Sequence, residues 1–206
     1  MKPLLAFLAL AFGSSAWAQP PVPKDVQAVI DRSHDMRADY AVFLTTEIAT
    51  PARRWTEVQA EFQRGASHRI EVSMARTLNN CDSGDSIVYD VAHSRYPDDG
   101  SIRGVCGIDV NADPILSARM LAPISGPYGR ADRIELTGEK FVRRYAVTPD
   151  GIIVGCDYVP RRPEVGFSMR TLKVEVRRGA QDPAMFTRAS LARAFAPAAD
   201  AGATSK

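Results

Sequence analysis

Residues 40–63 of the chain, YAVFLTTEIATPARRWTEVQAEFQ, decide the fold. The first strand they predict has one face formed by Tyr40, Val42, Leu44, Thr46 and Ile48. After a turn at residues 50–52, the second strand alternates Val58, Ala60 and Phe62 with Glu57, Gln59 and Glu61. Strict alternation of apolar and polar residues is typical of an antiparallel sheet with one face exposed to solvent. The stretch therefore predicts two antiparallel strands joined by a short turn.

The same period of two recurs along most of the chain. Further strands are predicted at residues 68–73, 86–91, 101–108, 133–136, 140–147, 152–158 and 167–177. Residues 79–85 are polar and are predicted to form a turn. Consecutive strands with tight connections favour an antiparallel meander over βαβ units. We expect an α+β, mostly β fold, with about eight or nine strands in one antiparallel sheet.

Three helices are predicted around this sheet. Residues 24–36 carry Val26, Val29 and Ile30 near helical spacing, which predicts an amphipathic helix before the first strand. Asp113 followed by Pro114 is typical of a helix start, so we expect a short helix bearing Leu116, Met120 and Leu121. A last helix is predicted at residues 187–195.

The N-terminus indicates export. Lys2 precedes an apolar run at residues 4–12, and small residues flank Trp17 at positions 16 and 18. This order is that of a secretory signal, and the run is too short to span a bilayer. We expect cleavage after Ala18, a single domain at residues 19–195, a disordered tail at 196–206, and a periplasmic location. A short N-terminal anchor is the alternative.

The composition of the chain limits the classes of binding partner that we expect. The chain is 45% apolar and 24% charged, as in ordinary globular proteins. Without Lys2, 25 basic and 24 acidic side chains remain, a net charge of about +1. A nucleic-acid binder takes much of its affinity from excess basic residues, so we expect no nucleic-acid partner. Later apolar runs are too short for a membrane span, so we expect peripheral membrane contact or none.

Three cysteines lie in the expected mature chain. An oxidising compartment favours one disulfide and one leftover thiol. Cys81 and Cys106 flank a predicted hairpin and are the preferred pair, which would stabilise the fold by roughly 3 to 4 kcal/mol. Cys106 with Cys156 is the alternative. Cys156 lies in an apolar run, which favours a buried structural thiol over a catalytic one.

Catalytic and metal-binding signals are weak. His34, His68 and His93 are far apart in the sequence, without the spacing typical of a zinc site. No Gly-x-Ser-x-Gly elbow or phosphate loop is present. We therefore expect no metal, no cofactor and no enzymatic activity, with an enzyme of dispersed site residues as the least favoured class. The Arg pairs 143–144, 161–162 and 177–178 can receive an acidic partner or a lipid phosphate, or can simply keep strand edges soluble.

A long sheet with an apolar face requires a cover, and two short helices supply little. This imbalance predicts a half-barrel cavity for an apolar ligand, with a fully collapsed core as the alternative. Strand alternation selects Val42, Leu44, Val58, Phe62, Tyr145 and Met169 as its lining residues.

Three stretches resemble the periplasmic lipoprotein-carrier (LolA-like) fold. They are the helix at residues 26–36 leading into the strand at 40–48, the pair of segments HRIE (68–71) and SIVYD (86–90), and LKVEV (172–176) followed by QDPAMF (181–186). The resemblance implies a helix before a curved antiparallel sheet, with short helices on its concave face. It also implies a binding protein for an acyl chain or lipidated polypeptide. The alternative is an envelope protein–protein or stress-sensing module with a filled cavity.

Overall fold

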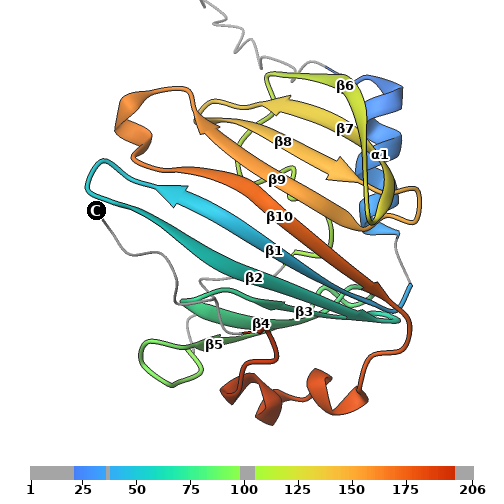
Figure 1. Ribbon diagram of the computed structural model, residues 1–206, viewed down its shortest axis with the longest axis vertical. Helices are drawn as coiled ribbons and strands as arrows, with labels where there is room; N and C mark the ends of the chain where they lie inside the picture. Colours follow the sequence, from blue (N-terminus) through green and yellow to red (C-terminus); the bar gives the residue numbers. More distant parts are fainter. Residues whose placement is uncertain (1–20, 36–37, 98–104, 198–206) are drawn as a thin grey trace, which may run out of the picture.

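The computed structural model describes residues 21–35, 38–97 and 105–197 (Figure 1). Within them, ten strands form one sheet in the order β5-β4-β3-β2-β1-β10-β9-β8-β7-β6. Every strand pairing is antiparallel, and β5 and β6 form the two open edges. The described part of the chain contains no helix with the length and apolarity needed to cross a membrane. The expected signal peptide and cleavage site, and the part of the expected tail after residue 197, lie outside the described residues.

The elements follow one another closely along the chain, except for the long connection between β5 and β6. They are α1 (Lys24–His34), β1 (Tyr40–Ala49), β2 (Arg54–Arg64), β3 (Ser67–Glu71), β4 (Ala75–Asn80), β5 (Ser86–Asp90), β6 (Ser117–Gly126), β7 (Gly129–Thr137), β8 (Phe141–Val147), β9 (Ile153–Pro160) and β10 (Ser168–Arg178). Three short 3-10 helices complete them: η1 (Pro163–Val165), η2 (Pro183–Phe186) and η3 (Arg188–Ala192). The expected mostly β architecture, with one helix before a curved, unclosed antiparallel sheet, is confirmed. This is the layout that the resemblance to the lipoprotein-carrier fold implied.

The centre of the sheet is made by strands from opposite ends of the chain. β1 pairs with β2 on one side and with β10 on the other, so two hairpin arrays meet along β1 and β10. A register shift occurs between Thr45 and Thr46 of β1, opposite residues 171–173 of β10. The two arrays, β1–β5 and β6–β10, are therefore joined along one long-range pairing that no local pattern encodes.

The two arrays are covered by different elements. Helix α1 buries Val26, Val29 and Ile30 against residues of β7 and β8. Residues 183–196, which we call the C-terminal segment, pack against the apolar side chains of β1 and β2 that include Phe43 and Phe62. In Figure 1 the helix lies beside β6 and β7, and the C-terminal segment lies at the β4–β5 end.

The prediction of a helix after Asp113 is wrong, because residues 117–126 form the edge strand β6. Asp113 does not cap a helix. Its buried carboxylate instead accepts the backbone N–H groups of Glu139, Lys140 and Phe141. Ala118 and Met120 pack inward two residues apart, so pairing with β7 overrides the local helix signal.

Three smaller differences concern the polar segments. A strand was not expected at residues 75–80, yet β4 forms there by pairing with β3 and β5. The Asn79 side chain donates to Thr77 and accepts from Ser86, so its polar atoms are satisfied within the sheet. Residues 105–108, the described end of the strand expected at 101–108, are irregular. In place of the helix expected at 187–195, a short 3-10 helix spans Arg188–Ala192, with the Thr187 side chain as its cap.

Candidate functional site

The six residues predicted to line a cavity are distributed over three regions. Val42 and Leu44 are buried with side chains of β8 and β9, and Tyr145 is buried in the cluster under α1. Phe62 lies in the cluster covered by the C-terminal segment, with Val58 at its margin. Directly paired residues share a face of a sheet, and Ala41, not Val42, pairs with Phe62. Phe62 and Val58 therefore lie on the face opposite Val42 and Leu44, and the structure does not bring the six together.

The sixth residue, Met169, belongs to a row of apolar side chains that crosses the sheet. Trp55 pairs with Ile48, Ile48 with Met169, and Met169 with Tyr158, so the four lie on one face of four adjacent strands. Phe141 and Phe167 extend the row, with ring centroids 5.5 and 6.1 Å from that of Tyr158. All six are only partly buried. We call Trp55, Ile48, Met169, Tyr158, Phe141 and Phe167 the aromatic strip.

The aromatic strip carries no charge of its own. The Tyr158 hydroxyl lies 3.0 Å from the Tyr145 hydroxyl, and burial raises the pKa of Tyr158 to about 12. Tyr158 therefore stays protonated across the physiological range. The Gln59 amide reaches the Met169 sulfur at 3.5 Å, which places a neutral polar group beside the strip. This composition suits an apolar ligand with few polar atoms.

A basic rim surrounds the end of the sheet that carries the strip. The β1–β2 turn, the β7–β8 turn and the β9–β10 loop meet there, because the strands alternate in direction. Residues 47–55, 138–141 and 160–170 contain six basic side chains and three acidic ones. The basic side chains, which we call the basic rim, are Arg53, Arg54, Lys140, Arg161, Arg162 and Arg170.

Only part of this rim is tied down by contacts within the chain. The Arg53 guanidinium lies 4.2 Å from the Trp55 ring centroid. Arg54 and Arg170 share Glu47 at 3.8 and 3.9 Å, distances of weak surface ion pairs. The Arg161 guanidinium donates one hydrogen bond to the Gly138 carbonyl at 2.6 Å. The side chains of Arg53, Arg54, Arg161, Arg162 and Arg170 are nevertheless exposed, so they can also meet an anionic group at the end of the strip.

The other Arg pairs singled out in the sequence serve the fold. Arg143 is fully buried and donates to the backbone carbonyls of Asp109 and Asp113. Arg144 donates to Glu135. Arg178 donates to Asp150, and this hydrogen bond holds the pKa of the Asp150 carboxyl below its usual range. Of the three pairs, only 161–162 lies in the basic rim.

A buried charge network beneath the C-terminal segment was missed in the sequence. Arg69 is fully buried and donates to Glu71, to the Met185 carbonyl and to the Ser190 hydroxyl. Glu71 in turn accepts the backbone N–H groups of Phe195 and Ala196. The available signal was two opposite charges two residues apart on one strand, which places both on the same face.

Comparisons with known proteins show likeness at the level of the fold. No protein-family model matches the sequence, and no curated protein matches it. An uncharacterized conserved protein from Thermus thermophilus is 12% identical with a TM-score of 0.49, over 83% of this chain and 94% of its own. A LolA superfamily protein from Nitrosomonas europaea is 11% identical with a TM-score of 0.40, over 80% and 98%.

A third similar structure is the MucA/MucB complex of Pseudomonas aeruginosa. The match is 8% identical with a TM-score of 0.49 and covers 81% of this chain. This chain spans 62% of the length of that neighbour, less than two thirds. At these identities no ligand, partner or residue role is carried over.

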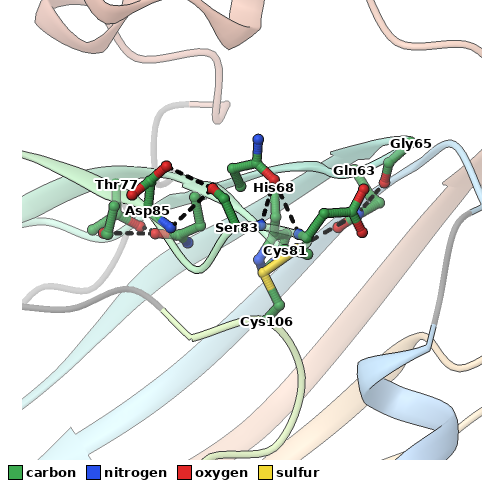
Figure 2. Close-up of a disulfide and its surroundings, with 12 residues drawn as sticks. Gln63, Gly65, His68, Thr77, Cys81, Ser83, Asp85 and Cys106 are labelled. Atoms are coloured by element: carbon green, nitrogen blue, oxygen red, sulfur yellow. Dashed lines mark hydrogen bonds between the residues drawn. A yellow bond between two sulfur atoms is a disulfide. The ribbon is translucent and has the colours of Figure 1, made fainter.

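The cysteines are arranged as the preferred pairing predicted. Cys81 and Cys106 form a disulfide, and Cys156 is a free thiol (Figure 2). Burial raises the pKa of the Cys156 thiol well above its usual range, so Cys156 stays protonated and is a poor nucleophile. His68 lies beside the disulfide in Figure 2.

Proposed function

We propose that this chain is an exported, non-enzymatic binding protein of the bacterial envelope that holds the apolar chain of a lipid or lipidated polypeptide. The observation that carries the proposal is the partly exposed aromatic strip, where Trp55, Ile48, Met169 and Tyr158 form one continuous row. Apolar side chains left accessible in a row are a binding feature when solvated neighbours surround them. The bound group would lie along this row.

The dimensions of the strip favour a linear ligand. Six side chains line it, whereas a stable protein–protein interface takes about 20–30 residues on each side. An acyl chain gains about 0.8 kcal/mol for each methylene removed from water, so a long chain needs only a narrow track. Edge-to-face contacts of Phe141 with Tyr158 and Phe167, and stacking of Tyr158 on Phe167, keep that track in place without a ligand.

The basic rim indicates the chemistry of the head group. An acyl chain along the strip would place its head near the turns that carry Arg53, Arg161 and Arg162. Guanidinium groups bind carboxylates and phosphates with paired hydrogen bonds. We therefore propose a ligand that combines an apolar chain with an anionic head group.

A binding titration with a long-chain fluorescent fatty acid tests the proposal. We expect the mature protein to bind the probe, and we expect Met169→Lys to weaken binding at least tenfold, because the ammonium group would lie in the apolar track. Val159→Lys is the matched control. Val159 is exposed on β9 next to Tyr158 and points to the opposite face, so this variant should bind as the wild type does.

Native mass spectrometry of protein purified from a periplasm complements the titration. A bound mass that is extracted into organic solvent would support the proposal and give the ligand class. Equal binding by Met169→Lys and Val159→Lys would remove the strip as the site. Failure of the wild type to take up the probe, together with a ligand-free mass, would turn the search to an envelope protein as the partner.

A further inference from the structure

His68 is a buried histidine whose hydrogen-bonding capacity is unused. Its side chain is 4% exposed, and neither ring nitrogen has a hydrogen-bond partner among the described residues. A buried polar group without a partner is costly, and native structures nearly always satisfy such groups. The carboxylate of Glu61 lies 3.4 Å from Nε2, without the geometry of a hydrogen bond. The position of His68 therefore requires an explanation beyond the packing of the sheet.

The disulfide lies next to this imidazole. One ring nitrogen of His68 and the sulfur atoms of Cys81 and Cys106 all lie within 4.8 Å of one another. The three residues come from β3, from the turn after β4 and from the segment that leads to Ile108. Cys81 and Cys106 are only partly buried, whereas His68 is buried.

An imidazole and two thiolates are typical ligands of Zn²⁺. Ligand atoms of a tetrahedral zinc site lie roughly 3.5–3.8 Å apart, given bonds of about 2.3 Å to sulfur and about 2.0 Å to nitrogen. With the S–S bond broken, shifts of about 1 Å would bring the three donor atoms to this spacing. A disulfide does not offer such donors, because the thiolate is the metal-binding form of cysteine.

We propose that Cys81, Cys106 and His68 form a redox-controlled Zn²⁺ site that is closed in the disulfide form and available in the dithiol form. The reaction that opens it is a thiol–disulfide exchange with a dithiol reductant. Two electrons from that dithiol reduce the S–S bond, its two protons pass to Cys81 and Cys106, and the reductant ends as its own disulfide. Zn²⁺ binding then releases both thiol protons to solvent.

Glu61 has a supporting role in this site. Histidine ligands of metals commonly donate their other ring N–H to a carboxylate, which orients the ring. Glu61 lies on β2, one strand from His68, at a distance that a small rotation would convert into such a hydrogen bond. Glu61→Gln is therefore expected to weaken Zn²⁺ binding by about 10–100-fold.

The test uses the mature chain carrying Cys156→Ser, so that Cys81 and Cys106 are the only cysteines. The protein is reduced with a phosphine under anaerobic conditions, and Zn²⁺ is titrated against a chromogenic chelator. We expect one Zn²⁺ per chain in the reduced protein and none in the oxidised protein. Co²⁺ in place of Zn²⁺ should give the intense thiolate-to-metal absorption of a sulfur-ligated ion.

His68→Asn separates the proposed site from simple chelation by two thiols. This variant keeps the disulfide, so its oxidised form is expected to fold, and its reduced form should bind Zn²⁺ at least tenfold more weakly. Near-UV circular dichroism of each reduced protein checks that tertiary structure is retained. Equal affinity of the His68→Asn and His68 proteins, or no difference between reduced and oxidised wild type, would overturn the proposal.

Discussion

The element that covers the β1–β5 array and the element that covers the β6–β10 array are held to the sheet by different interactions. Helix α1 packs on β7 and β8 through aliphatic side chains, with Ile30, Ile134 and Leu136 at most 3% exposed. The C-terminal segment is instead held by charged hydrogen bonds that Arg69 donates and Glu71 accepts, beside the apolar cluster that contains Met185 and Phe62. Although Arg32 of α1 also pairs with Asp132 of β7 at 2.9 Å, the helix is held mainly by non-directional burial and the C-terminal segment mainly by directional bonds. The C-terminal segment contains only short 3-10 helices, whose free backbone groups are available to Arg69 and Glu71.

The largest effect is expected when the hydrogen bonds that hold the C-terminal segment are removed. Arg69→Ala leaves Glu71 as an uncompensated buried charge and removes the donors to Met185 and Ser190. We expect a loss of about 3–5 kcal/mol in the free energy of unfolding. Urea unfolding measures it, and limited proteolysis should show cleavage in residues 183–196 first.

Arg170→Ala is the matched control for that loss. Arg170 is exposed and reaches Glu47 only at 3.9 Å, so its removal should cost less than about 1 kcal/mol. An Arg69→Ala protein as stable as Arg170→Ala would show that the C-terminal segment is held by apolar contacts alone.

The next largest effect is expected when the apolar contact of α1 with the sheet is reduced. Ile30→Ala should cost about 2–4 kcal/mol, because it leaves a cavity between α1 and the sheet. Ile30→Val removes one methylene and should cost about 0.5–1.5 kcal/mol. Urea unfolding of both variants gives the ratio. Equal losses in the free energy of unfolding for the two variants would mean that the helix shifts to close the cavity and is not rigidly packed.

Within both arrays, the strands differ in how far the sequence predicts them. The alternation in residues 40–63 is enough to predict β1 and β2, because apolar residues recur at every second position of each strand. β4 and β6 were missed because pairing with neighbouring strands, not local pattern, makes them strands. An Asp-Pro helix signal fails where the carboxylate is needed by a turn 26 residues away.

The aromatic strip shows the same limit for the site. Met169 was among the predicted lining residues, whereas Trp55 and Tyr158 were not. The three meet only because β1 pairs with β10, and a register shift at Thr45 and Thr46 sets which side chains align. Residue pattern predicts which face of one strand is apolar. It does not predict the partner strand or its register, and a binding row across four strands depends on both.

The smallest expected effect concerns the outer strands of the β6–β10 array. Burial of Glu135 raises the pKa of its carboxyl, but hydrogen bonds from Arg144 and Arg119, both at 2.8 Å, outweigh burial and hold the pKa below its usual range. A carboxyl with a lowered pKa in the folded state stabilises the fold above its unfolded pKa of about 4.3, and this contribution is lost as pH falls through the folded value.

Glu135→Gln should therefore be less stable than wild type by about 1–2 kcal/mol at pH 7, and the difference should shrink as pH falls below about 4. Thermal unfolding followed by circular dichroism across this range measures the difference, with Glu175→Gln as the control on exposed β10. If the Glu135→Gln deficit stayed constant with pH, the side chain would act through its shape and not its charge. The pH-dependent part of the stability would then come from other groups, such as the Asp150–Arg178 pair.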